Sequence, residues 1–196
     1  MNARHMTNNE PIVVLLGSAS PRRAKILAGL GVRFEVVVPR VEETGDGDPR
    51  DAVRRNALRK LDWCRSRHPG RRILTADTVV VSEGRPVGKP ASLAEARQWL
   101  LSFSGQHQDV LTGIAYRDGR GRVRDEAVRS VVRFRPFAGE AVEAYLSRVD
   151  PLDKAGGYDI DQHGDVLIAG WDGSRTNIMG LPGERVTEWL TEDGVL

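Results

Sequence analysis

The sequence predicts an α/β protein with a long mixed β-sheet flanked by helices. Short apolar runs alternate with stretches of helical periodicity, a pattern typical of strands joined by helices. Residues 107–116 and 122–134 are two long strand-like runs around a turn at 118–121. Such a hairpin requires antiparallel pairing, so the sheet is expected to be mixed. The 196 residues, 40% of them hydrophobic, suffice for one domain with a sizeable core.

The first half of the chain carries the clearest signals for element boundaries. A buried strand is predicted at 12–16, followed by a helix with Ser20 as N-cap, Pro21 in the first helical position and Gly31 at its end. The next predicted elements are a strand at 34–38, a helix from 48 to about 67, a strand at 73–81 and a hairpin turn at 82–85.

The second half adds a capped helix, the long hairpin and two further helices. Ser92 and Glu95 form a capping box, and the helix that they open is expected to end at Gly105. Helices are also predicted at 139–148 and 183–192, with a glycine-rich segment and short strands between them.

The composition excludes several classes of protein. Cys64 is the sole cysteine of the sequence, so neither an internal disulfide nor a cysteine-rich zinc site can form. No apolar run approaches the ~20 residues that span a bilayer, and residues 1–10 lack the apolar core of a signal peptide. We therefore expect a cytoplasmic protein without a membrane partner, in which a flexible segment (1–10) precedes one domain (11–196).

The charges nearly balance, with 29 basic and 27 acidic residues, so no overall field predicts a nucleic-acid partner. Six arginines between positions 50 and 67 are interpreted as a solvated helix face. The basic residues comprise 25 arginines and only four lysines. A GC-rich genome would explain this ratio, and under such a bias a retained lysine can mark a need for a compact ammonium group. The lysines are Lys25, Lys60, Lys89 and Lys154.

A candidate phosphate site lies at the predicted strand–helix junction, residues 17–23. A helix N-terminus attracts anions through its free N–H groups and partial positive charge. The hydroxyl of Ser18 and the guanidinium groups of Arg22 and Arg23 add donors that match phosphate oxygens. Adjacent arginines in a first helical turn oppose the helix dipole, which favours an anion site over the alternative, an ordinary strand–helix corner.

Asp77 interrupts an otherwise apolar strand. Burial of a carboxylate there is costly unless cations or donors compensate. Asp77 could form a structural ion pair with an arginine. Alternatively, it could be a metal ligand or general base at the end of a strand, and its apolar neighbours favour this second interpretation. Two more motifs, Gly88-Lys89-Pro90 and DKAGGY at 153–158, are by themselves at least as consistent with plain turns as with ligand contacts.

Taken in order, these segments resemble the Maf family of nucleoside triphosphate pyrophosphatases. The matching stretches are GSASPRR at 17–23, ADTVV at 76–80, GKP at 88–90, SG at 104–105, VLTG at 110–113, DKAGGY at 153–158 and GLP at 180–182. Each is weak alone, but the ordered set is specific and extends from about residue 13 to residue 190.

The resemblance implies a fold of the Maf and inosine triphosphatase type, with two lobes around a central cleft, and a homodimer. It implies cleavage of a nucleoside triphosphate between its α and β phosphates, with Mg²⁺ or Mn²⁺ as cofactor and a nucleoside monophosphate and pyrophosphate as products. By position, the implied site residues are Ser18, Arg22 and Arg23 for the phosphates, Glu43 and Asp77 for the metal, and Asp77, Lys60 and Lys89 for catalysis.

Three residues bear on the choice of base. Thr78 is similar to the branch of the family that cleaves dTTP and UTP. That family usually continues Tyr-Gly-Ile-Gln-Gly after the Lys-Ala-Gly segment, whereas here Asp161 stands where glutamine is expected and Gln162 follows one place later. An amide donates and accepts hydrogen bonds, while an ionised carboxylate only accepts. The expected substrate is therefore dTTP or UTP if Gln162 takes that position, and a different or modified nucleotide otherwise.

Two other functions are compatible with the sequence. The first is a non-enzymatic, nucleotide-binding regulator of cell division or septum formation, a role also attached to this family. The presence of Asp77, Glu43, Lys60 and Lys89 argues against it. The second is a nucleic-acid-binding protein that uses the arginines at 50–67, for which strongly salt-dependent binding would be the sign.

Overall fold

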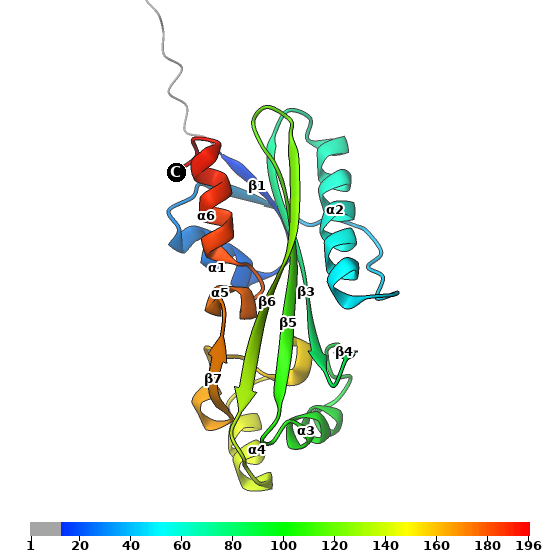
Figure 1. Cartoon of the computed structure of the whole chain (residues 1–196), viewed down its shortest axis with the longest axis vertical. Coiled ribbons are helices and arrows are strands. Elements are labelled where there is room, and N and C mark those ends of the chain that lie inside the picture. The colour runs from blue at the N-terminus through cyan, green and yellow to red at the C-terminus, as the bar shows by residue number, and fades with distance from the viewer. Residues whose placement is uncertain (1–12) are drawn as a thin grey trace, which may run out of the picture.

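The computed structural model describes residues 13–196 and confirms the predicted α/β fold (Figure 1). Seven strands form one mixed sheet in the order β2-β1-β3-β5-β6-β7, with β4 paired to β3 beside this path. The strands are β1 (Val14–Gly17), β2 (Phe34–Val37), β3 (Arg72–Ser82), β4 (Arg85–Val87), β5 (His107–Arg117), β6 (Val123–Phe134) and β7 (Ile168–Asp172). The segment 1–10, expected to be flexible, lies outside the described residues.

Helices cover both faces of this sheet. They are α1 (Pro21–Gly29), α2 (Pro49–Arg67), α3 (Leu93–Ser102), α4 (Gly139–Leu146), α5 (Arg175–Ile178) and α6 (Gly183–Glu192). Helix α2 packs on one face, while α1 and α6 lie on the opposite side (Figure 1). Within residues 13–196, none of the helices combines the length and the apolar character needed to cross a membrane.

Two apolar cores share the sheet face opposite α2 and give the molecule its two lobes. One core joins α1 and α6 to β1, β3 and β5, and the other joins α3 and α4 to β5 and β6. Between them the sheet is polar, because Thr78 of β3 and Thr112 of β5 lie opposite each other with their hydroxyl oxygens 2.9 Å apart. These two threonines of β3 and β5 therefore separate the two apolar cores.

Helix α2 approaches the sheet closely at Gly113 of β5. A Cβ atom at this position would lie 2.2 Å from the carbonyl oxygen of Val53, so only glycine permits the contact. The contact fixes α2 against β3 and β5. It therefore also fixes the two buried polar side chains of that helix, Asn56 and Lys60.

One edge of β3 is left unpaired in the middle of the strand. Parallel strand β1 pairs with β3 only as far as Gly17 opposite Thr75, and the short β4 pairs with it only from Val80 onward. Residues 76–79 therefore lack a strand partner on this edge. In α/β sheets, ligands bind beyond the carboxyl ends of the strands, so this gap beside the end of β1 is where a site is expected.

The predicted elements are largely confirmed. Ser20, Asp48 and Ser92 cap α1, α2 and α3 with their side chains. Three helices end earlier than predicted: α1 at Gly29, α3 at Ser102 and α4 at Leu146. The expected glycine-rich segment before α6 contains one strand, β7, the short helix α5, and 3-10 turns at Ala155–Gly157 and Gly164–Val166.

Candidate active site

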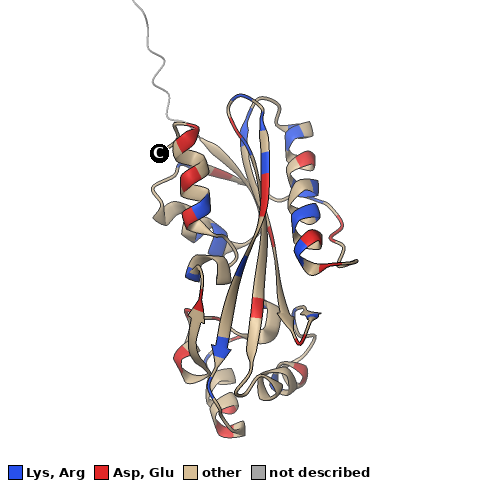
Figure 2. Cartoon of the chain, in the orientation of Figure 1, with Lys and Arg blue, Asp and Glu red and all other residues tan. Residues whose placement is uncertain are grey.

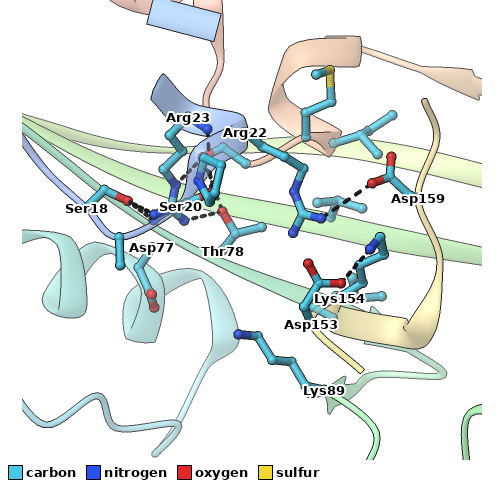
Figure 3. A pocket seen from close by; sticks show the side chains of 18 of the residues that line it. Ser18, Ser20, Arg22, Arg23, Asp77, Thr78, Lys89, Asp153, Lys154 and Asp159 are labelled. Carbon is cyan, nitrogen blue, oxygen red and sulfur yellow. Dashed lines mark hydrogen bonds and ion pairs between the residues drawn. The ribbon is translucent and has the colours of Figure 1, made fainter. Parts of the chain in front are cut away.

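A cleft of about 560 Å³ opens at the carboxyl end of β1, beside the unpaired edge of β3. We call its first side the sheet wall: residues 17–23, Glu43, Lys60, Asp77 and Thr78. We call its second side the facing wall: Lys89, residues 153–155, residues 158–160 and Gln162. Figure 3 shows charged side chains from both walls directed into the space between them. Three of the four lysines line the cleft, whereas Lys25 lies exposed on α1.

Arg23 links two segments of the sheet wall to Gly180, which also lines the cleft. Its Nη1 donates to Ser18 Oγ (3.2 Å), its Nη2 to Thr78 Oγ1 (2.9 Å) and its Nε to the carbonyl oxygen of Gly180 (2.7 Å). Burial lowers the pKa of Arg23, and the charges of Asp77 and Glu43 act in the opposite direction. Arginine stays charged despite such shifts. Arg23 therefore holds the junction loop in place and brings a fixed positive charge to it.

Arg22, the next residue along α1, is bound much less tightly. Its side chain is 35% exposed, and Nη1 lies 3.5 Å from Asp159 Oδ2 on the facing wall (Figure 3). Within residues 13–196 its guanidinium has no other hydrogen bond or ion pair. The remaining N–H groups of Arg22 are therefore available to a ligand in the cleft.

Lys60 of α2 lies between two carboxylates. Its Nζ is 2.7 Å from Asp77 Oδ1 and 2.7 Å from Glu43 Oε1, and it also donates to the carbonyl oxygen of Ala76 (3.2 Å) on the open edge of β3. Asn56, one helical turn earlier, donates to Asp77 Oδ2 (2.9 Å). Both oxygens of the buried Asp77 carboxylate thus have a fixed donor, while the Glu43 side chain is 56% exposed.

The facing wall presents two lysines in different settings. Lys89 is exposed and forms no hydrogen bond or ion pair with the described part of the chain. Lys154 is buried and donates to the carbonyl oxygen of Asp150 (2.8 Å) and to Asp153 Oδ1 (2.5 Å). A backbone bond from Gly156 N to the Gly88 carbonyl oxygen (2.9 Å) joins the two lysine motifs.

Part of the cleft lining is apolar, with Val80, Val110, Tyr158 and Ile160 among its residues. Tyr158 packs edge-on against Phe134, and its buried hydroxyl has no hydrogen-bond partner within residues 13–196. Gln162 lines the cleft. Asp161 does not, because its carboxylate forms an ion pair with Arg175. Gln162, rather than Asp161, therefore borders the cleft.

The carboxylates of Glu43 and Asp77 fit a divalent cation. Glu43 Oε1 and Asp77 Oδ1 each lie 2.7 Å from Lys60 Nζ, so the two carboxylates lie around one ammonium group and border the same part of the cleft. Within residues 13–196, no three His, Cys, Asp or Glu side chains gather into a complete set of metal ligands. Mg²⁺ commonly uses one or two carboxylates together with waters and substrate phosphates. The pair suits a metal whose coordination a polyphosphate completes.

The arginines between positions 50 and 67 engage groups of the protein itself. Basic residues predominate on this helix, with Asp51 and Asp62 as its acidic residues (Figure 2). Arg54 pairs with Asp125 and Arg65 with Asp62, while Arg67 lies over the ring of Trp63. The remaining partners are the Ala127 carbonyl for Arg50, the Asp46 carbonyl for Arg55 and the Thr44 hydroxyl for Arg59.

Two polar residues at the site were not singled out in the sequence. Asn56 lies four residues before Lys60, on a helix face otherwise formed by Val53, Ala57 and Leu61. That spacing was a usable signal, because an amide and an ammonium on one apolar face require a shared partner. Asp159 gave no such signal, because its burial depends on the fold of an irregular segment.

The fold and the cleft define an α/β protein with a cationic site beside two carboxylates, suited to a polyanionic ligand. The Maf family pattern, described as Maf-like protein, matches residues 13–193, and the chain belongs to this family. A relative from Syntrophus aciditrophicus, named dTTP/UTP pyrophosphatase, is 41% identical over 93% of this chain and 91% of its own length. A second, of the same name, from Symbiobacterium thermophilum is 41% identical over 92% of this chain and 94% of its own.

A solved structure adds evidence for the fold alone. The Ham1 protein of Staphylococcus aureus superimposes with a TM-score of 0.53 at 13% identity, covering 92% of this chain and 98% of that protein. The family pattern confirms the predicted family, and this structural likeness confirms the predicted fold.

Proposed function

We propose that this protein is a nucleoside triphosphate pyrophosphatase, which hydrolyses the bond between the α and β phosphates to release a nucleoside monophosphate and pyrophosphate. The observation that carries the proposal is the pair of carboxylates held by Lys60 in a cleft whose other charged groups are largely cationic. The name dTTP/UTP pyrophosphatase, shared by relatives that match over nearly their full length, supports the same reaction.

The cations of both walls would bind the triphosphate. Arg22 has free N–H groups directed into the cleft, and Lys89 has no competing partner within residues 13–196. Ser18 lies in the loop before α1 and Arg23 in the first turn of this helix, whose dipole favours an anion. Positive charges fixed in advance stabilise the negative charge that grows on the leaving pyrophosphate.

Asp77 would act as the general base. Its carboxylate is fixed by Lys60 and Asn56, and its oxygens keep lone pairs free for a water molecule. As the water oxygen bonds to the α-phosphorus, its proton passes to Asp77 and the bond to the bridging oxygen breaks. The electron pair of that bond leaves with pyrophosphate. A Mg²⁺ or Mn²⁺ ion held by Glu43 and Asp77 would supply Lewis-acid stabilisation of phosphate charge.

The substrate base would lie against the apolar part of the facing wall. Gln162 lines this region and offers both a donor and an acceptor, as a pyrimidine edge requires. Thr78 also lines the cleft, and Arg23 and Thr112 fix its hydroxyl there. We therefore propose dTTP and UTP as substrates rather than a modified nucleotide selected by Asp161.

A panel of canonical and modified triphosphates, incubated with Mg²⁺ or Mn²⁺, tests the proposal. Pyrophosphate released from dTTP and UTP is the expected result. Nucleotide binding without any release of pyrophosphate would favour a regulatory protein of cell division instead. Homodimerisation and a cytoplasmic location are also proposals, which light scattering and cell fractionation would test.

A further inference from the structure

Arg22 and Asp159 join the two walls of the cleft. Arg22 belongs to α1 on the sheet wall, and Asp159 belongs to the irregular segment of the facing wall. Their side chains meet at 3.5 Å (Nη1 to Oδ2), and Figure 3 shows Arg22 reaching across the cleft toward this carboxylate. A charge-assisted bond of ideal length is about 2.8 Å, so Arg22 retains freedom to adjust while it stays near Asp159.

The Asp159 carboxylate is firmly held. The backbone N–H of Asp159 donates to the buried Tyr145 hydroxyl (2.7 Å). Gly164 packs closely on the backbone carbonyl oxygen of Asp159, because a Cβ at Gly164 would lie 2.9 Å from that oxygen. Its Oδ1 accepts from the backbone N–H of Asp161 (2.9 Å). The side chain is only 4% exposed. These contacts fix the carboxylate and leave Oδ2 directed at Arg22.

Arg22 is the cation that compensates this buried charge. Within residues 13–196, no other Lys, Arg or His nitrogen lies within ion-pair distance of Asp159. A buried carboxylate that loses its cation becomes strongly unfavourable, which opposes movement of Arg22 into solvent. Arginine has five N–H donors, so Arg22 can keep its bond to Asp159 and still offer donors to a ligand.

We propose that Asp159 is a positioning residue, which holds the Arg22 guanidinium over the cleft so that its free N–H groups meet a phosphate group. This inference rests on the proposed function, in which Arg22 contacts the triphosphate. Asp159 thereby contributes to anion binding although its own charge is negative.

Whether removal of the Asp159 carboxylate weakens or strengthens anion binding distinguishes a positioning role from the direct effect of its negative charge. By Coulomb's law, removal of a negative charge from the cleft wall strengthens the binding of an anion. Positioning predicts the opposite, because without the carboxylate Arg22 is free to leave the cleft. Inorganic pyrophosphate in the presence of Mg²⁺ is a suitable probe, since it carries phosphate groups but no base.

The experiment is a double-mutant cycle read by titration calorimetry on the full chain. Asp159→Asn is expected to weaken pyrophosphate binding at least about threefold, whereas in an Arg22→Ala background, where only the removed charge acts, it is expected to leave binding unchanged or to strengthen it. Asp161→Asn is the matched control, because it removes a carboxylate two residues away that pairs with Arg175. The control is expected to bind as the wild type does. Tighter or unchanged binding by Asp159→Asn, an equal loss in both backgrounds, or no binding by the wild type would overturn the inference.

A second variant guards against misfolding of Asp159→Asn. Tyr145→Phe removes only the hydroxyl that accepts from the Asp159 N–H, and it is expected to weaken pyrophosphate binding in the same direction, again only when Arg22 is present. In turnover assays, Asp159→Asn is expected to raise KM more than it lowers kcat. An inactive wild type that still binds pyrophosphate with this coupling would refute the proposed reaction and leave the positioning role intact.

Discussion

The two walls of the cleft are built in different ways. On the sheet wall, Asp77, Lys60 and Arg23 come from a strand and two helices, and each has at least two protein partners. On the facing wall, the side chains come from loops and 3-10 turns, and Lys89 has no partner within residues 13–196. Asp77, Lys60 and Arg23 thus lie on regular elements, whereas the facing wall is built from irregular chain.

The largest expected effect is on the sheet wall, at Asp77. Asp77→Asn keeps the shape of the side chain and its contact with Lys60, but it removes the proposed base. We expect kcat to fall between about a hundredfold and ten-thousandfold, measured as pyrophosphate release. Asp125→Asn, which removes a surface carboxylate paired with Arg54, is the matched control and should retain wild-type turnover. Near wild-type turnover of Asp77→Asn, with the fold intact, would contradict the assignment.

The two cleft lysines give the most direct comparison of the walls. Lys60→Met leaves the buried Asp77 without its cation, so we expect a loss of about 3 kcal/mol in the free energy of unfolding together with loss of turnover. Lys89→Met removes an exposed ammonium, so we expect loss of turnover with unchanged stability. Urea unfolding measures the stability of each variant, and pyrophosphate release measures its turnover. Equal stability of the two variants would refute the contrast between the walls.

Base selection tests the facing wall. Gln162→Ala is expected to reduce the preference for dTTP and UTP over purine triphosphates by about tenfold, the loss associated with one hydrogen bond to a ligand. Asp161→Ala should leave this preference unchanged, because the carboxylate pairs with Arg175 outside the cleft. Competition between dTTP and dGTP measures the ratio of kcat/KM values. The reverse pattern would assign selection to Asp161.

The smallest effect is expected far from both walls, at Asp193. Burial alone would raise the pKa of Asp193, but hydrogen bonds from Tyr116, Arg72 and the Gly119 N–H outweigh it and hold the pKa below its ordinary value. A depressed carboxyl pKa stabilises the fold above the unfolded value of about 3.9, and the contribution disappears as pH falls through the folded value.

Asp193→Asn should therefore cost about 1–2 kcal/mol at pH 7 without changing turnover. The difference in unfolding free energy from the wild type should shrink below about pH 4. Denaturant titrations at pH 7 and pH 3 check this, and a difference that grows in acid would contradict it.

The sequence named residues on both walls, but it placed the side chains only of the sheet wall, because that wall is built largely on regular elements. Asp77 stands out because periodicity identifies its strand as apolar, and Ser20 and Pro21 mark the start of α1. Regular elements repeat, so spacing places their side chains. The path of residues 155–166 depends instead on positive φ angles at Gly156, Gly157 and His163. For this reason, sequence position alone could not decide between Asp161 and Gln162.

The unpaired edge of β3 at residues 76–79 also affects how the protein behaves at high concentration. A strand edge with free N–H and C=O groups can recruit a strand from another molecule and start aggregation. Here the Ala76 carbonyl accepts from Lys60, and the charges of Lys60 and Asp77 lie beside the gap. Charges directed inward at an edge are a known protection against such pairing. The ion pair proposed for turnover thus also discourages self-association through this edge.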